Sequence, residues 1–202
     1  MDCDRVWEVL WSAEQREALL AELLDKFRQE TAQNGLAQIE EDYEIGRERL
    51  SAVLTSDQLK QLDTLESSCA EEAVIALRIA LERGIFAGFQ HFFQRDTEPL
   101  TFEGFVLDKL LTVPEMKQFP DYCEARSKVN ELETELADQL DSFSQEHLTS
   151  ITSAWEERSL AMLRYGFSLG QRAAADIIRR VAPEQAARMI EPSWRVAQET
   201  KI

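Results

Sequence analysis

Glycine, proline, cysteine and histidine are all scarce in this chain of 202 residues. It contains 7 Gly, 5 Pro, 3 Cys and 2 His. So few turn-forming residues argue against a many-stranded β-sandwich and against a glycine-rich nucleotide-binding α/β fold. Three scattered cysteines, Cys3, Cys69 and Cys123, are too few and odd in number for a disulfide framework. We therefore expect a reducing, cytoplasmic setting.

A long, uninterrupted hydrophobic run is also missing. Residues 1–4 read Met-Asp-Cys-Asp, so no basic start precedes an apolar stretch, and we expect no signal peptide. The most apolar stretch, residues 73–93, includes four ionisable side chains, among them Arg78 and Glu82. Such groups are too costly for a span that faces lipid, so this stretch is expected to be a buried helix.

Basic residues are few relative to acidic ones. There are 38 Asp and Glu against 22 Lys and Arg, which gives a formal net charge of −16. Residues 1–149 carry a net charge of −18 and residues 150–202 carry +2. An acidic surface repels nucleic-acid phosphates and anionic lipids, so we expect neither direct nucleic-acid binding nor membrane binding. A partner bound through electrostatics should be basic.

Hydrophobic residues recur at helical spacing through most of the chain. Ser12–Gln15 and Thr55–Gln58 have the pattern of capping boxes, which predicts a helix start at each. The first start leads to one bent helix or two collinear helices, with a break at Asn34-Gly35. The second leads to a helix of nearly 40 residues, and a final long helix is expected from about Ser144 to Val181. No stretch has the pattern of a strand.

An internal repeat at an offset of 86 residues is the most informative feature of the sequence. Each half carries a small residue at every fourth position of its long helix, which lets two helix backbones approach closely. These residues are Ala80, Gly84 and Gly88 in the first half and Gly166, Gly170 and Ala174 in the second. A 3-4 spacing is followed by Val74, Leu77, Leu81, Gly84 and Gly88 in the first half, and by Leu160, Leu163, Phe167, Gly170 and Ala174 in the second. This spacing predicts the seam of an antiparallel or coiled-coil-like helix pair.

The fold class predicted from these patterns is all-α. We expect a helical bundle of two pseudo-repeated long-helix hairpins. The first repeat would span residues 1–95 and the second, with a C-terminal tail, residues 120–202. Short helices in residues 96–119, which contain Pro99 and Pro114, would connect the two, and both repeats would share one core.

A stretch of the second repeat carries a resemblance to a known family. Residues 164–172 read Arg-Tyr-Gly-Phe-Ser-Leu-Gly-Gln-Arg, and Glu156-Glu157 and an acidic, Leu-rich helix precede them. This stretch resembles small helical-hairpin proteins of anaerobic Gram-positive gut bacteria, which carry a GF-x-LG-x-R pattern. The likeness covers about residues 120–180, and the first half matches as a degenerate copy. The family has no known function, so the resemblance implies a helical fold and no chemistry.

Residues that could support catalysis or hold a cofactor are few. Neither His91 nor His147 has a Ser, Cys or carboxylate placed by the sequence as its partner, so we expect no enzymatic activity and no cofactor. Acidic pairs recur in the two halves as Glu71-Glu72 and Glu156-Glu157. They could hold a cation in the bundle core, or they could be solvated or paired with Arg78 and Arg164.

Two rows of carboxylates form the candidate partner surface. They lie at helical spacing in the two halves: Glu40, Glu44 and Glu48, and Glu131, Glu135 and Asp138. Such rows can steer a basic protein, can imitate nucleic-acid phosphates, or can simply keep a protein soluble. The leading interpretation is a non-catalytic protein that binds a basic protein partner. The alternative is an inhibitor of the phage or mobile-element type that mimics nucleic acid; a metal-binding or enzymatic bundle comes third. A homodimer is left open.

Overall fold

The computed structural model describes residues 13–31, 37–93 and 119–181 of the chain. Almost all of these residues are helical, and none of them is in a strand. The helices are α2 (Ala13–Thr31), α3 (Ala37–Ser51), α4 (Ser56–Phe93), α7 (Pro120–Ala137) and α8 (Ser142–Val181). The expected all-α class is confirmed. The short helices expected in residues 96–119 lie outside the described residues.

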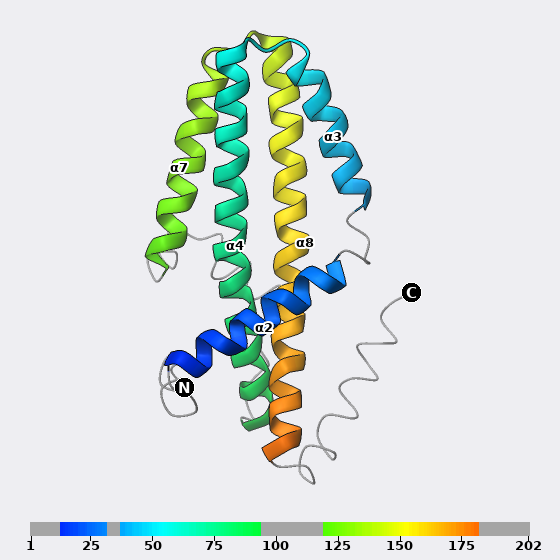
Figure 1. Ribbon diagram of the computed structural model, residues 1–202, viewed down its shortest axis with the longest axis vertical. Helices are drawn as coiled ribbons and strands as arrows, with labels where there is room; N and C mark the ends of the chain where they lie inside the picture. Colours follow the sequence, from blue (N-terminus) through cyan, green and yellow to red (C-terminus); the bar gives the residue numbers. More distant parts are fainter. Residues whose placement is uncertain (1–12, 32–36, 94–118, 182–202) are drawn as a thin grey trace.

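Two long helices, α4 and α8, form the centre of the molecule, with α7 along one side and α3 along the other (Figure 1). A short turn joins α3 to α4, yet α3 packs along α8. A second short turn joins α7 to α8, yet α7 packs along α4. The two connections therefore cross at one end of the bundle, which we call the turn end.

The central helices run in the same direction. Gly84 of α4 lies against Phe167 of α8, and four residues later Gly88 lies against Gln171. Higher numbers on one helix therefore meet higher numbers on the other, so the pair is parallel. The antiparallel alternative for this seam is wrong.

Helix α2 crosses the lower halves of α4 and α8 obliquely (Figure 1). Leu20, Leu23 and Phe27 of its apolar stripe are buried there, and Arg16 donates a 2.6 Å hydrogen bond to Glu82 of α4. The expectation of one bent helix or two collinear helices is wrong, because α2 and α3 run in different directions. Each of these helices buries its apolar residues against the central pair, α2 against the lower halves of α4 and α8 and α3 near the turn end.

The helix starts follow from local chemistry. The backbone N–H of Thr55 donates to Oε1 of Gln58 at 2.9 Å, and the backbone N–H of Gln58 donates to Oγ1 of Thr55 at 3.4 Å. This reciprocal pair confirms the second capping box. Before α8, the side chain of Asp141 accepts a 2.8 Å hydrogen bond from the backbone N–H of Ser144. Helix α7 begins with Pro120, whose missing N–H costs nothing at that position.

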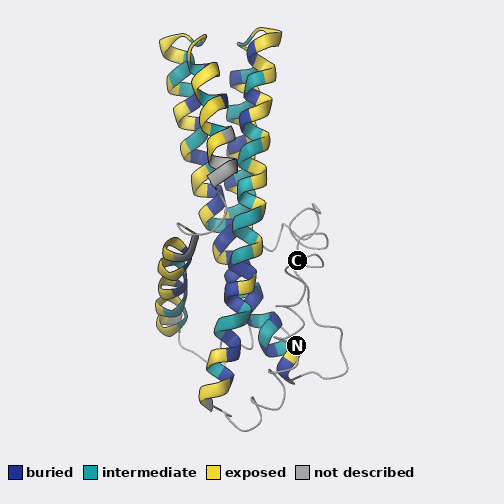
Figure 2. Cartoon of the chain, turned by 90° about the vertical axis from the view of Figure 1, so that its right-hand side faces the viewer, coloured by how far each residue is buried: buried dark blue, intermediate teal, exposed yellow. Residues whose placement is uncertain are grey.

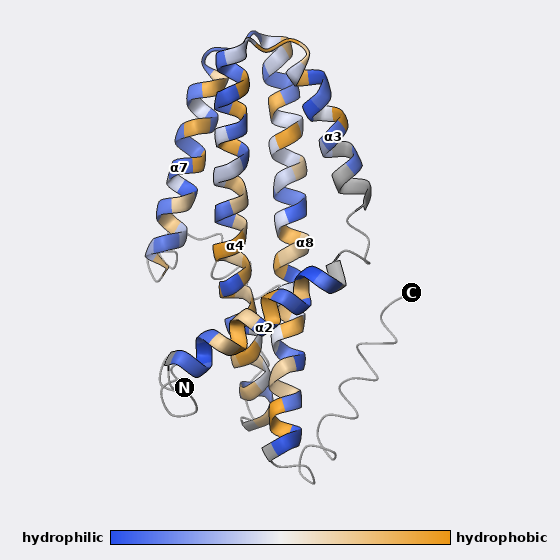
Figure 3. Cartoon of the chain, in the orientation of Figure 1, coloured by the Kyte–Doolittle hydropathy of each residue, from blue (hydrophilic) through white to orange (hydrophobic). Residues whose placement is uncertain are grey.

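The buried residues of the core are visible as dark blue along the inside of the helices in Figure 2. At the turn end, α3, α4, α7 and α8 bury Leu50, Leu62, Leu65, Val129, Leu136, Leu148 and Ile151. Lower down, α2, α4 and α8 bury a second cluster that includes Phe27, Leu81, Ile85 and Leu169. Along α3 and α7, hydrophilic and hydrophobic positions alternate, as surface helices require (Figure 3).

Three hydrophobic residues of the expected helix patterns are exposed. Val74 and Leu160, the first residues of the two expected seams, face solvent, and so does Phe143. Seven residues further along, Leu81 and Phe167 are buried, although a step of seven residues turns a straight helix by only about 20°. At the level of Val74, Ala73 and Ala76 occupy the buried side of α4 instead.

None of the described helices combines the length and the apolar composition that a membrane crossing requires.

Candidate functional site

The six small residues of the repeat lie between α4 and α8. A Cβ added to Gly84 would overlap the backbone carbonyl of Phe167, and a Cβ added to Gly170 would overlap the backbone carbonyl of Leu81. A Cβ on Gly88 would lie 2.6 Å from the Cβ of Ala174, and one on Gly166 would meet Leu77 and Ala80. The two helix backbones therefore touch along this row, which is a packing contact and offers no reactive group.

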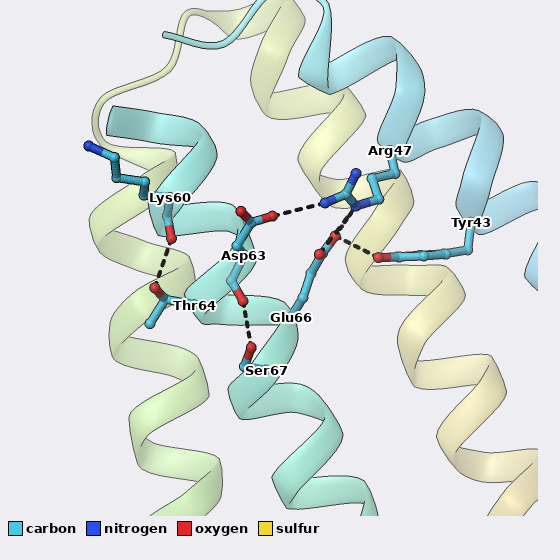
Figure 4. A network of polar contacts seen from close by, with 7 residues as sticks. All are labelled: Tyr43, Arg47, Lys60, Asp63, Thr64, Glu66 and Ser67. Atoms are coloured by element: carbon cyan, nitrogen blue, oxygen red, sulfur yellow. Dashed lines mark hydrogen bonds and ion pairs between the residues drawn. The ribbon is translucent and has the colours of Figure 1, made fainter. Parts of the chain in front are cut away.

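A polar network holds α3 on α4 near the turn end (Figure 4). Its centre is Glu66 of α4, which accepts a 2.5 Å hydrogen bond from the hydroxyl of Tyr43 and a 2.9 Å hydrogen bond from Nε of Arg47. The same guanidinium donates to Asp63 at 2.9 Å. The ring of Tyr43 stands edge-on to Trp155 of α8, with centroids 5.6 Å apart. The network thus ties α3 to both long helices.

Two residues of this network have raised pKa values. Burial and the hydrogen bond to Glu66 raise the pKa of Tyr43 well above its ordinary value. The hydrogen bond to Glu66 is also the main reason that the pKa of Arg47 is raised. A protonated phenol and a charged guanidinium on one carboxylate make a stable structural contact. With their pKa values raised, Tyr43 stays protonated and Arg47 stays charged near neutral pH.

A second network holds α7 on the long helices. Glu72 of α4 is buried, and Nη1 of Arg126 on α7 lies 3.3 Å from its Oε1. Nη2 of the same guanidinium lies 3.3 Å from Glu156 of α8. Burial disfavours the charged form of Arg126 and is the largest single effect on its pKa, but Glu72, Tyr122 and Glu156 together outweigh it, so the pKa of Arg126 is raised. Burial, with Glu72 nearby, raises the pKa of Tyr122 as well.

Three glutamates of the recurring acidic pairs lie in ion pairs with Arg126 or Lys128. Glu72 and Glu156 share Arg126, and Glu71 lies 3.4 Å from Nζ of Lys128. Arg78, which was considered as a partner, instead pairs with Glu17 and Glu82. Within the described residues no group of three or more His, Cys, Asp or Glu side chains is arranged to hold a metal ion.

The other candidates for chemistry have ordinary surroundings. Burial raises the pKa of Cys69 to about 12, so its thiol stays protonated and weakly nucleophilic. His91 is exposed in the last turn of α4. The ring of His147 packs edge-on against Phe143, with centroids 4.6 Å apart.

The two carboxylate rows lie on opposite flanks of the bundle. Glu44 and Glu48 are exposed on α3, whereas Glu131 and Glu135 are exposed on α7, and Asp138 is exposed where α7 ends. The helices α3 and α7 flank the central pair on its two sides (Figure 1). The side chain of Glu40 lies outside the described residues. The rows therefore form two separate acidic surfaces rather than one.

Charge is divided along the length of the molecule. Residues 37–72 and 119–160, which we call the four-helix part, hold 20 acidic and 6 basic side chains, a net charge of −14. The lower halves of the long helices, residues 73–93 and 161–181, hold 2 acidic and 6 basic side chains, a net charge of +4. Both α4 and α8 thus begin acidic and end basic.

Of the residues at the centres of the two networks, Glu72 was identified from the sequence as one of an acidic pair, but Glu66 and Arg126 were not identified. A signal for the glutamates was present, because each is four residues from a buried apolar residue of the same helix: Glu66 follows Leu62 and Glu72 precedes Ala76. A carboxylate within an apolar helical stripe needs a cation or a donor from a neighbouring helix. The sequence did not show which helix supplies the cation for Glu72, because the packing of α7 on α4 was not predicted.

The chain matches no protein-family model, no curated protein and no solved structure at a significant level.

Proposed function

We propose that this chain is a non-catalytic helical protein that binds a basic surface of another protein. The observation that carries the proposal is the net charge of −14 on the four-helix part. Its helices are held together by a continuous core and by two interhelical ion networks, so the carboxylates on its flanks are presented by a rigid body. Such a surface speeds the encounter with a basic partner and disfavours anionic ones.

The placement of the rows bears on the nucleic-acid-mimic alternative. A mimic that inhibits a nucleic-acid-binding protein, as phage and mobile elements encode, needs carboxylates at phosphate-like spacing along one surface. The two rows lie on opposite flanks of the bundle, which favours a basic protein patch over a nucleic-acid-binding cleft as the target. In the same proposal the protein acts in the cytoplasm and needs no cofactor.

We also propose that the two halves of the chain are copies of one helix–turn–helix unit. In support, α3 and α7 end at Ser51 and Ala137, and α4 and α8 begin at Ser56 and Ser142, each pair 86 residues apart. Three pairs in the upper core have the same offset: Leu50 and Leu136, Leu62 and Leu148, Leu65 and Ile151. The interleaved copies would then share one core. The resemblance to gut bacterial helical-hairpin proteins remains a prediction about the origin of this unit.

The proposed function can be tested on a partner captured from the native cytoplasm. We expect capture to weaken steeply as salt rises, because exposed charges are screened over about 8 Å at physiological ionic strength. Changing Glu40, Glu44, Glu48, Glu131, Glu135 and Asp138 to the corresponding amides should slow association more than it speeds dissociation.

A variant with Glu14 and Glu22 of α2 changed to Gln serves as the control, since both are exposed outside the four-helix part. It should leave the association rate almost unchanged. Binding that is indifferent both to salt and to the six changes would overturn the proposal. Displacement of the partner by DNA or RNA would favour the mimic instead.

A further inference from the structure

Most of the exposed large hydrophobic residues lie in α3, just after it or at the start of the helix on which α3 packs. In the described residues five large hydrophobic side chains are exposed, and three of them belong to α3, the turn after it and the start of α8. These are Ile45, Val53 and Phe143, which are 41%, 51% and 61% exposed. The other two, Val74 at 49% and Leu160 at 42%, lie in the middle of α4 and of α8.

The packing of α3 on α8 places Val53 and Phe143 at the same level. The two helices run in opposite directions (Figure 1). Gly46 of α3 lies against Ile151 of α8. Seven residues beyond Gly46 the chain reaches Val53. Seven residues before Ile151 it reaches Ser144, the neighbour of Phe143. Both hydrophobic residues therefore lie at the turn end, where Figure 2 shows much exposed surface.

Carboxylates adjoin these hydrophobic residues on α3. Glu44 and Glu48 are exposed one turn apart on the helix that carries Ile45, together with the exposed cation Arg49. The row on α7 differs, because no large hydrophobic residue of α7 is exposed. We call the surface formed by Glu44, Ile45, Glu48, Val53 and Phe143 the α3 edge.

We propose that the α3 edge is the docking surface for a basic, amphipathic helical segment of a partner protein. The inference rests on the proposed function and assigns its contact to one flank. Apolar side chains of the segment would cover Val53 and Phe143, and an exposed aromatic residue is a typical anchor of such an interface. Lysine or arginine side chains beside them would meet Glu44 and Glu48.

The negative charge of the molecule favours a basic helical segment over a second copy of the chain or an anionic membrane. A second copy of the chain would bring its own net charge of −16 against an acidic surface. An anionic membrane would be repelled for the same reason. A cationic segment with one apolar face complements both properties of the edge.

The test uses two labelled peptides of about 18 residues, long enough for several helical turns. The first consists of Lys, Ala and Leu with the Leu residues on one helical face. In the second, Ala replaces every Leu. Binding to the full-length protein is measured by fluorescence anisotropy, and circular dichroism shows that each variant is folded.

Val53→Ser with Phe143→Ser should weaken binding of the Leu peptide by about tenfold or more, because two apolar contacts are lost. The matched control, Val74→Ser with Leu160→Ser, removes equally exposed residues elsewhere and should change binding by less than about twofold. Glu44→Gln with Glu48→Gln should weaken binding of both peptides more than Glu131→Gln with Glu135→Gln does, although the change in net charge is the same.

Each other outcome overturns the inference in a recognisable way. If both peptides bind with strong salt dependence and the serine pairs behave alike, the α3 edge is not the docking surface while the proposed function stands. If neither peptide binds, both proposals fail. If sedimentation shows a dimer that Val53→Ser with Phe143→Ser dissociates, the occupant is a second copy.

Discussion

At the scale of single residues, the contact between α4 and α8 depends on the absence of side chains. Gly84 and Gly170 each lie against a backbone carbonyl of the other helix, so even a methyl group has no room. Glycine inside a helix costs about 0.5–1 kcal/mol relative to alanine, and the close approach of two long helices offsets that cost. Glycines in the middle of helical patterns were visible in the sequence, which is why this contact could be predicted from it.

Gly170→Ala should destabilise the protein although alanine is the better helix former. The new Cβ would meet the backbone carbonyl of Leu81, which cannot move without shifting α4, and we expect a loss of about 1–3 kcal/mol in the free energy of unfolding. Gly46→Ala is the control, because its Cβ would lie 3.2 Å from Cγ1 of Ile151, the side chain of which can adjust.

Urea unfolding followed by circular dichroism measures both variants. The control should lie within about 1 kcal/mol of the parent, since the gain in helix propensity offsets a small shift. A Gly170→Ala variant as stable as Gly46→Ala would show that α4 and α8 do not approach closely in solution.

Other residues could not be placed from the sequence. Val74 and Leu160 have the same spacing to their neighbours as buried residues do, so the pattern of one helix does not distinguish them from the core. The roles of Glu66 and Glu72 depend on which helix supplies Arg47 and Arg126. Those pairings are long-range, and a periodic pattern in one helix carries no information about them.

At the scale of helices, the sequence predicted where the long helices start and how long they are, but it did not predict the directions in which the helices run. The capping box at Thr55 and the proline at the start of α7 act within a few residues, so both could be read from the chain. The oblique course of α2 and the packing of α3 on α8 depend instead on which apolar surfaces are left free elsewhere. The start of α8 also depends on a local contact, the hydrogen bond between Asp141 and Ser144, which can be tested by substitution.

The cap of α8 should contribute a pH-dependent part of the stability. The hydrogen bond from the backbone N–H of Ser144 lowers the pKa of Asp141 below its ordinary value. A lowered native pKa stabilises the folded state above the pKa of the unfolded chain, and this contribution is lost as pH falls through the native pKa. Asn at this position still caps the helix but does not titrate.

We therefore expect the parent to exceed Asp141→Asn in stability at neutral pH and the difference to vanish in acid. Urea unfolding of both proteins between neutral pH and about pH 3 measures it. Asp141→Ala, which lacks the cap, should remain less stable than Asp141→Asn at neutral pH. A difference between the parent and Asp141→Asn that grows in acid would contradict the assignment of Asp141 as an ionised cap.

At the scale of the molecule, charge follows position along the bundle rather than position along the chain. Dividing the sequence at residue 150 gives net charges of −18 and +2 and hides the fact that α4 changes sign as α8 does. The structure brings the acidic halves of both helices together with α3 and α7, so that 20 carboxylates share one body with 6 cations. Ion pairs such as Arg47–Glu66 and Arg126–Glu72 compensate only a minority of them.

This excess of like charge predicts that salt stabilises the protein. The Debye length falls from about 30 Å at 0.01 M to about 8 Å at physiological ionic strength, so repulsion across the four-helix part is screened while the short ion pairs are affected less. Each kcal/mol gained should raise Tm by about 2–4 °C in a chain of this size. Scanning calorimetry over this range of NaCl concentration measures the shift.

The size of the shift should depend on the flanks. A variant with Glu44, Glu48, Glu131 and Glu135 changed to Gln has four fewer exposed carboxylates, so its Tm at low salt should rise and its salt dependence should shrink. A parent Tm that falls as salt is added would mean that the two ion networks outweigh the repulsion. The carboxylates of the flanks would then already be neutralised within the fold, and an acidic surface could no longer steer a basic partner.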